Sequence, residues 1–163
     1  MAHHHRQRTS FETIESLKPM VRHLLICCLA FAAPPVAAQS INFGDNFSEW
    51  ANDGECDDRR FVGPGMAEEL DRDDTGHDAS DCRKAHRQGL ITLWDQTKAA
   101  AATQCSAIQF GNNRSEHARD GECDDPRFEG TGTSTVVITD DLGRDAADCR
   151  RACDLGTVFL RNY

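Results

Sequence analysis

Acidic side chains cluster around cysteines at two places in the sequence. Four carboxylates lie close to Cys56 and four shortly before Cys82, and the same eight positions return around Cys123 and Cys149. Packed carboxylates repel one another unless a cation neutralises them, and calcium takes about six to eight oxygen ligands. The candidate ligands are Asp53, Glu55, Asp57, Asp58, Asp73, Asp74, Asp78 and Asp81, with Asp120, Glu122, Asp124, Asp125, Asp140, Asp141, Asp145 and Asp148 at the matching positions.

The same acidic residues could instead serve the local structure of the loops. Asp78 or Asp81 is suited to cap a following helix, and arginines such as Arg60 and Arg127 could pair with other carboxylates. Glycines such as Gly54 favour calcium, because they permit the tight turns that bring backbone carbonyls to a cation. The sequence therefore predicts a calcium site, with capping, turn formation and arginine pairing as the alternative.

Two familiar metal motifs do not fit these residues. If Asp71 is taken as the first residue of an EF-hand loop, Cys82 stands where the twelfth residue should be glutamate. A zinc site made of cysteines is not indicated either, because no CxxC pair occurs after residue 38. Oxygen ligands are the ones that the sequence offers.

The chain contains one sequence module written twice. Residues 43–83 return as residues 110–150, 67 positions later and without a gap, and about half of the aligned positions are identical. The run that begins at Asp53, DGECDD, recurs unchanged at Asp120. We predict a signal segment at 1–38, a first module at 39–95, a linker at 96–105 and a second module at 106–163, with about 57 residues in each module.

Six cysteines follow residue 38, and an even number in an exported chain is typical of a disulfide framework. The only two cysteines of the first module have counterparts in the second, so each such pair should close one loop. The two cysteines unique to the second module should then pair with each other. The predicted disulfides are Cys56–Cys82, Cys123–Cys149 and Cys105–Cys153.

Two short motifs of the first module occur together. Trp50 precedes the run DGECDD, and Asp78-x-x-Asp81 leads directly into Cys82. This combination resembles the LDL-receptor class A module, a small disulfide-rich calcium knot with a Trp-x-Cys-Asp-Gly run and an acidic cluster before a cysteine. The resemblance covers about a third of each module. It implies that a cation is bound by Asp53, by Asp57 or Asp58, by Asp78 and by Asp81.

Composition and patterning predict a small, loop-rich α+β fold that disulfides hold together, because short apolar runs and few aromatics cannot bury a large core. The linker has strong helix propensity. A β-branched run at 135–138 predicts an edge strand where the first module has the acidic stretch 68–71. The other predicted elements of each module are a first strand (41–43; 108–110), a helix ended by glycine (79–88; 146–154) and a last strand that pairs with the first (90–94; 157–160).

The first 38 residues have the pattern of an export signal. Met20 and Arg22 precede an apolar run of about ten residues, which ends at two prolines before small residues that suit cleavage after Ala38. The run is well short of the roughly 20 residues that a membrane-spanning helix needs. We expect an exported protein, periplasmic or secreted, without a stable membrane anchor, and Met20 is a possible translation start.

The charge balance restricts the class of partner. The chain has 18 basic and 27 acidic residues, and loss of residues 1–38 removes four basic and two acidic ones, which leaves a net charge of about −11. Nucleic acids and anionic membranes call for lysine and arginine, so the charge argues against both as partners. The charge suits metal ions, cationic ligands or basic proteins.

The histidines, serines and cysteines of the sequence do not form the pattern of a catalytic site. No histidine is shared by both modules, and no serine or cysteine lies in a nucleophile motif. We therefore predict an acidic tandem-repeat binding protein that holds calcium in each module, and not an enzyme. The alternatives are a metal-free disulfide scaffold and, more distantly, a small carboxylate-based hydrolase. Residues that differ between the copies are the candidates for partner contact, namely Phe47 and Trp50 and, in their places, Arg114 and His117.

Overall fold

Two helices of the same length form where the sequence predicts them, α1 (Ala79–Arg87) and α3 (Ala146–Asp154). Each is followed by a glycine of positive φ, Gly89 at 72° and Gly156 at 70°. The residue after each glycine donates its N–H to a carbonyl in the helix, as in a helix that ends through a left-handed glycine. The computed structural model describes residues 40–163, so the predicted signal segment at 1–38 lies outside the described residues.

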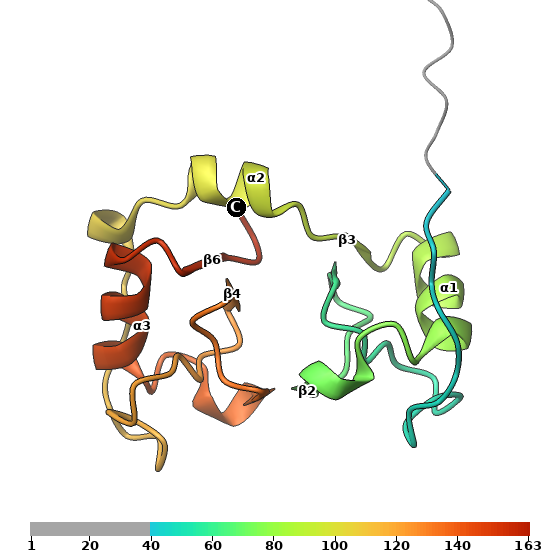
Figure 1. Cartoon of the computed structure of the whole chain (residues 1–163), viewed down its shortest axis with the longest axis horizontal. Helices are drawn as coiled ribbons and strands as arrows, with labels where there is room; N and C mark the ends of the chain where they lie inside the picture. The colour runs from blue at the N-terminus through green and yellow to red at the C-terminus, as the bar shows by residue number, and fades with distance from the viewer. Residues whose placement is uncertain (1–39) are drawn as a thin grey trace, which may run out of the picture. The chain divides into compact units, whose positions relative to one another are not determined.

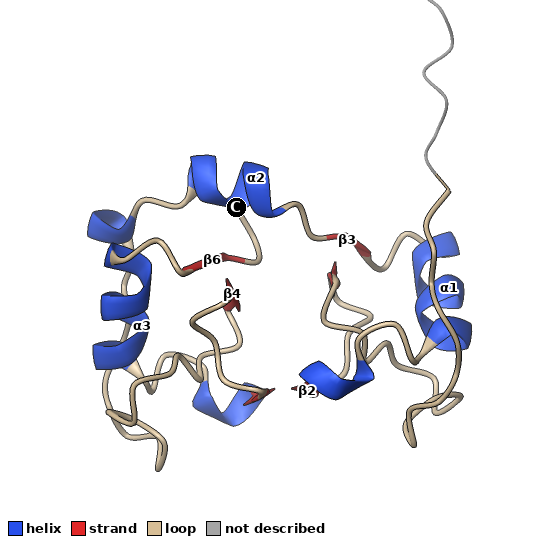
Figure 2. Ribbon diagram, viewed as in Figure 1, coloured by secondary structure: helices blue, strands red, loops and turns tan. Residues whose placement is uncertain are grey.

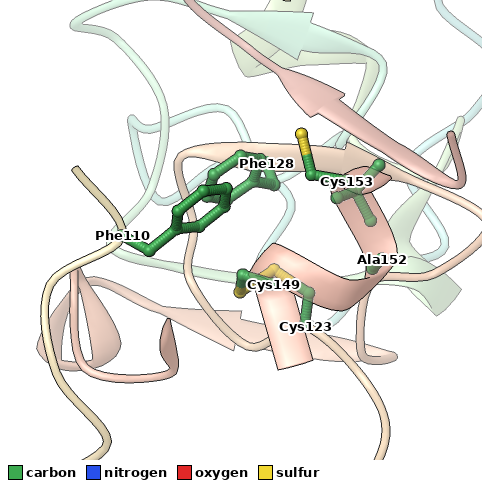
Figure 3. Close-up of a cluster of buried hydrophobic side chains, with 7 residues drawn as sticks. Phe110, Cys123, Phe128, Cys149, Ala152 and Cys153 are labelled. Atoms are coloured by element: carbon green, nitrogen blue, oxygen red, sulfur yellow. A yellow bond between two sulfur atoms is a disulfide. The ribbon is translucent and has the colours of Figure 1, made fainter. Parts of the chain in front are cut away.

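The structure contains the three predicted disulfides, Cys56–Cys82, Cys123–Cys149 and Cys105–Cys153. The first two join the acidic loops to α1 and α3, and their four cysteines are fully buried. Beside each lies a pair of stacked phenylalanine rings, with centroids 5.5 Å apart for Phe43 and Phe61 and 5.6 Å apart for Phe110 and Phe128. Figure 3 shows the second of these small cores, in which the Cys123–Cys149 disulfide lies against the helix.

Short antiparallel strand pairs complete each half of the described chain. Strand β1 (Phe61–Val62) pairs with β3 (Thr92–Leu93), and β4 (Phe128–Gly130) pairs with β6 (Val158–Leu160). Long loops connect these elements, drawn in tan in Figure 2. The described part of the chain is thus a small α+β structure with three α-helices, short antiparallel sheets and three disulfides.

The predicted first strands at 41–43 and 108–110 are wrong, and the last strands pair with β1 and β4 instead. An arginine side chain explains the difference in each half. Arg60 donates to the carbonyls of Asn42 (3.1 Å) and Phe43 (3.4 Å), so this extended segment satisfies its backbone without a strand partner. Arg127 does the same for Gln109 and Phe110.

A third strand pair joins the two halves. Strand β2 (Glu69–Asp71) runs antiparallel to β5 (Val136–Ile138), with Leu70 opposite Val137, its counterpart 67 residues later. Strand β5 lies within the predicted edge strand at 135–138. The acidic stretch of the first half is also a strand, which the sequence analysis did not predict, because charged residues are depleted in strands and the pairing partner lies far along the chain.

The segment between the halves contains helix α2 (Gln96–Ala102), drawn in yellow in Figure 1. Asp95 caps it by accepting a hydrogen bond from the Lys98 N–H, and Ala99 is fully buried. After α2, the hydroxyl of Thr103 accepts a hydrogen bond from the N–H of Leu160.

Short 3-10 turns form at η1 (Arg72–Asp74), η2 (Cys105–Ala107) and η3 (Thr139–Asp141).

A buried ion cluster also connects the halves, and we call it the joint cluster, made of Arg59, Glu129 and Arg161. Arg59 Nε lies 3.2 Å and Arg161 Nη1 2.8 Å from Glu129 Oε2. All three residues are at most 9% exposed. Each occupies a position where the other half has a residue of a different type, so the cluster is not part of the pattern that the two halves share.

Candidate metal centre

The acidic loop of the first half is held by backbone bonds around Cys56. Its N–H donates to Gly65 O at 3.0 Å, and its carbonyl accepts from the Ala67 N–H at 3.0 Å. The disulfide to Cys82 places the loop against the first turn of α1. Asp57, which follows Cys56, and Asp78, which precedes α1, are therefore brought together although they are far apart in sequence.

Asp57 and Asp78 each have a buried carboxylate oxygen without a partner. Asp78 is fully buried, and its Oδ2 accepts the Asp57 N–H at 3.0 Å, while its Oδ1 has no hydrogen-bond partner. Asp57 is 4% exposed, and its Oδ2 has no partner either. Buried polar atoms are almost always satisfied, so a pair of such oxygens needs an explanation.

The second half repeats this arrangement in detail. Asp145 Oδ2 accepts the Asp124 N–H at 3.0 Å, and Asp145 Oδ1 and Asp124 Oδ2 are buried without a partner. These four atoms are the only buried side-chain oxygens or nitrogens without a partner among residues 40–163. Their recurrence at the same two positions argues against an accident of local packing.

The capping alternative does not account for Asp78 and Asp145. Both occupy the N-cap position of their helix, but neither side chain makes a capping hydrogen bond. Each carboxylate is turned instead toward the acidic loop across the disulfide. A capping role would have satisfied the oxygens through the helix N–H groups.

In the absence of a cation, the environment shifts the pKa values of these carboxyl groups toward the protonated form. Burial, followed by the charges of nearby acidic groups, of which Asp53 acts most strongly, raises the pKa of Asp57 to about 7. Burial raises the pKa of Asp78 to about 6 and that of Asp124 to about 6, and it raises the pKa of Asp145 as well. A bound cation would reverse this, because opposite charge favours the ionised form.

Further carboxylates surround the pair at different depths. In the first half, Asp53, Glu55 and Asp74 act electrostatically on Asp57 and line a cleft beside it. We call this the acidic cleft, and its lining is Glu49, Trp50, Asp53, Glu55, Asp57, Ala67, Glu68, Glu69, Asp71 and Asp74. In the second half, Asp120 and Glu122 are exposed and Asp141 is buried, at positions equivalent to Asp53, Glu55 and Asp74.

Asp81 and Asp148 tie the loop to the helix. Asp81 Oδ2 accepts the Gly54 N–H at 3.2 Å, and Asp148 Oδ2 accepts the Gly121 N–H at 3.3 Å. The two glycines have φ values of 110° and 107°, in a region that L side chains rarely adopt. Asp81 and Asp148 therefore shape the loop in which the two aspartates without partners lie.

Four of the predicted ligands have other surroundings. Both oxygens of Asp58 bond with Arg60, and Oδ2 also accepts the Gly76 N–H at 3.0 Å; Asp125 and Arg127 form the same arrangement. This is the arginine pairing that the sequence left open, and it already compensates the charge of Asp58 and Asp125. Asp73 and Asp140 are exposed on the 3-10 turns and lie outside the acidic cleft.

Two groups of cysteine and aspartate atoms could hold a metal ion, one of Cys56, Asp78 and Cys82 and the other of Cys123, Asp145 and Cys149. Within each group, the potential ligand atoms lie within 4.8 Å of one another. The sulfurs are bonded in disulfides, so they are not the thiolates that soft metals prefer. The oxygens of Asp78 and Asp145 remain as donors, and they favour a hard cation.

The candidate partner residues all lie on the surface. Phe47 is 86% and Trp50 is 53% exposed, and Arg114 and His117 are exposed as well. Phe47 packs edge-on against the ring of His77, which in turn contacts Asp45. Trp50 lines the acidic cleft, and Phe47 and Trp50 together line a neighbouring hollow. The two aromatic side chains and the carboxylates of the first half therefore form one surface.

Comparisons with known proteins leave the assignment to the geometry, since no protein-family model, curated protein or solved structure matches this chain. None of the helices within residues 40–163 has the length and hydrophobicity that crossing a bilayer requires. The three disulfides are compatible with an exported protein, because such bonds persist in oxidising compartments.

Proposed function

We propose that this protein is an exported calcium-binding protein made of two copies of one module, each of which holds one calcium ion in its disulfide-closed acidic loop. The observation that supports it best is the pair of buried aspartate oxygens without partners, present at matching positions in both halves. A cation between Asp57 and Asp78, or between Asp124 and Asp145, would satisfy both oxygens and offset the cost of burying two carboxylates.

The choice of calcium rests on the donor atoms and the compartment. All the free donors are oxygens, several are carboxylates at the mouth of the site, and calcium accepts six to eight such ligands at about 2.4 Å. Magnesium demands a nearly ideal octahedron and keeps more of its water. The proposed ligands are Asp53, Asp57, Asp74 and Asp78, with Asp120, Asp124, Asp141 and Asp145 in the second module, and Glu55 and Glu122 adjoining them.

Matching contacts support the proposal of two modules. The loop–helix disulfide, the stacked phenylalanines, the arginine–aspartate pair and the bond between Asp78 and the Asp57 N–H all recur 67 residues later. When one structural unit has been duplicated, residues that are identical in the two copies are expected to make the same local contacts.

The partner that suits the first module is a basic segment of another protein or another cationic ligand. The acidic cleft carries eight carboxylates, more than one divalent ion neutralises. Trp50 on its rim offers an aromatic face to a cation. The second module has His117, Thr135, Val136 and Ile138 where the first has Trp50, Glu68, Glu69 and Asp71, so we expect the two modules to differ in what they contact.

The proposal is tested by counting bound ions. Native mass spectrometry of the oxidised protein, equilibrated with calcium and desalted, should show two ions per chain. The variant Asp78→Asn should show one, while the exposed-residue control Asp73→Asn should still show two. Zero ions in the wild-type protein would leave the metal-free disulfide scaffold as the better account.

A further inference from the structure

A continuous run of backbone hydrogen bonds connects the two candidate metal centres. It begins at Cys56, which precedes Asp57. The backbone of Cys56 is hydrogen-bonded to that of Gly65 and Ala67. Residues 65–67 thus lie directly along the backbone of the first site. The chain then enters β2 after a single further residue, Glu68.

The connection crosses from one half to the other at β2 and β5. Two bonds of 2.9 Å flank the strand pair symmetrically: Arg72 N–H donates to Thr135 O, and Thr139 N–H donates to Glu68 O. The two donors, Arg72 and Thr139, occupy equivalent positions in the two halves, and so do the acceptors, Thr135 and Glu68. Strand pairs of three residues are marginal by themselves, so the order of this pair depends on what holds its ends.

In the second half the same path leads to the other site. Ser134, just before Thr135, donates its N–H to Cys123 O at 3.0 Å, and Cys123 N–H donates to Gly132 O at 2.9 Å. Asp124 follows Cys123. Residues 132–134 thus lie directly along the backbone of the second site.

A side chain reinforces the backbone path. Arg59 lies two residues after Asp57 and is 3% exposed. Its Nη1 donates to Ser134 O at 2.9 Å and to Thr135 O at 2.8 Å. A shift of the first loop therefore acts directly on the segment that lies beside Asp124.

We propose that the two sites bind calcium cooperatively, through the β2–β5 pair and Arg59. This inference rests on the proposed calcium function. An ion that draws Asp57 and Asp78 together fixes the loop at Cys56, with it residues 65–67, and hence the start of β2. The strand pair then holds Thr135 and Ser134 in the position that the second loop needs, so the second ion binds at a smaller cost in ordering.

The experiment is calorimetric titration of the full oxidised chain with calcium chloride. Typical coupling between sites changes affinity by about 5- to 150-fold. In Asp145→Asn, which disables the second site, the first site should bind calcium more weakly than it does in the wild-type protein when the second site is occupied, by a factor in this range. Asp78→Asn should weaken the second site by the same factor, since coupling is reciprocal.

Two further variants locate the connection. Arg59→Met should retain two sites but lose the cooperative shape of the titration, whereas Arg87→Met, at an exposed arginine on α1, should leave it unchanged. If the remaining site of each single-site variant bound calcium with the same affinity as in the wild-type protein, the coupling would be overturned and the calcium function would stay intact. No binding in the wild-type protein would overturn both.

Discussion

We expect the double variant Asp57→Asn, Asp124→Asn to bind calcium at least about 100-fold more weakly than the wild-type protein. Changes to groups that only support metal ligands already cost about 10- to 100-fold in affinity. The two substitutions remove the charge of buried carboxylates whose Oδ2 atoms have no partner in the protein. Calcium titration followed by calorimetry measures the effect.

A matched pair of exposed aspartates provides the control. Asp73 and Asp140 occupy equivalent positions in the two halves and are exposed on their 3-10 turns. The double variant Asp73→Asn, Asp140→Asn changes the net charge by the same amount, so it should alter affinity by only a small factor. Equal losses in the two double variants would mean that overall charge, and not a defined site, attracts calcium.

Without calcium, the first double variant should be more stable than the wild-type protein at neutral pH. Burial raises the pKa of Asp57 to about 7 and that of Asp124 to about 6, above the value of about 4 in an unfolded chain. The native state thus binds more protons than the unfolded state, so the free energy of unfolding in EDTA falls as the pH rises from about 4 to about 7. Asparagine has no proton to lose, so the variant should lose less stability over this range.

We expect Glu129→Ala to lower the free energy of unfolding by about 3–5 kcal/mol. Glu129 is the only acidic partner of Arg59 and Arg161 in the joint cluster, and its removal leaves two buried guanidinium groups without a counter-charge. Denaturant unfolding with the disulfides intact measures the change. Glu116→Ala provides the control, because that side chain is 88% exposed and its loss should cost less than about 0.5 kcal/mol.

A triple variant separates the value of the charges from the cost of an unpaired charge. Replacing the cluster by apolar residues, with Arg59→Met, Glu129→Leu and Arg161→Met, should leave the stability nearly unchanged or higher, as for other buried ion clusters. If Glu129→Ala had no larger effect than Glu116→Ala, the joint cluster would not hold the two halves together.

The parts of the fold that local rules determine could be predicted from the sequence. Gly89 and Gly156 mark the ends of α1 and α3, since a left-handed residue terminates a helix and glycine adopts that conformation without strain. The disulfide pairing followed from comparing the two halves, because the simplest scheme closes one equivalent loop in each half and leaves Cys105 to pair with Cys153. These predictions needed no knowledge of how distant segments meet.

The strand partners could not be predicted, because they depend on a single side chain in each half. Arg60 occupies the carbonyls of Asn42 and Phe43, so the segment that has the pattern of a strand pairs with a guanidinium group. The last strand then meets β1, which lies in a region that the sequence analysis treated as loop. Hydrophobic pattern contains no information on such a competition.

The candidate site was predicted as a list of sixteen carboxylates, and the structure separates them by their surroundings. Asp57 and Asp78 have unpartnered oxygens, Asp58 is paired with Arg60, and Asp81 bonds to the backbone of Gly54. Asp57 and Asp58 are adjacent and of the same type, so sequence could not distinguish their roles. The residues of the joint cluster have no counterparts of the same type in the other half, so the shared pattern of the two halves does not reveal them.

The most direct test of the calcium proposal is thermal unfolding of the oxidised protein in excess calcium and in excess EDTA, with free thiols counted on the same sample. Calcium at about 100 times its dissociation constant stabilises a fold by about 2.7 kcal/mol for each site, or about 5.4 kcal/mol for two sites, so the unfolding temperature should rise by about 20 °C without the appearance of free thiols. Identical unfolding curves would contradict the calcium sites and leave an acidic scaffold that its disulfides hold together.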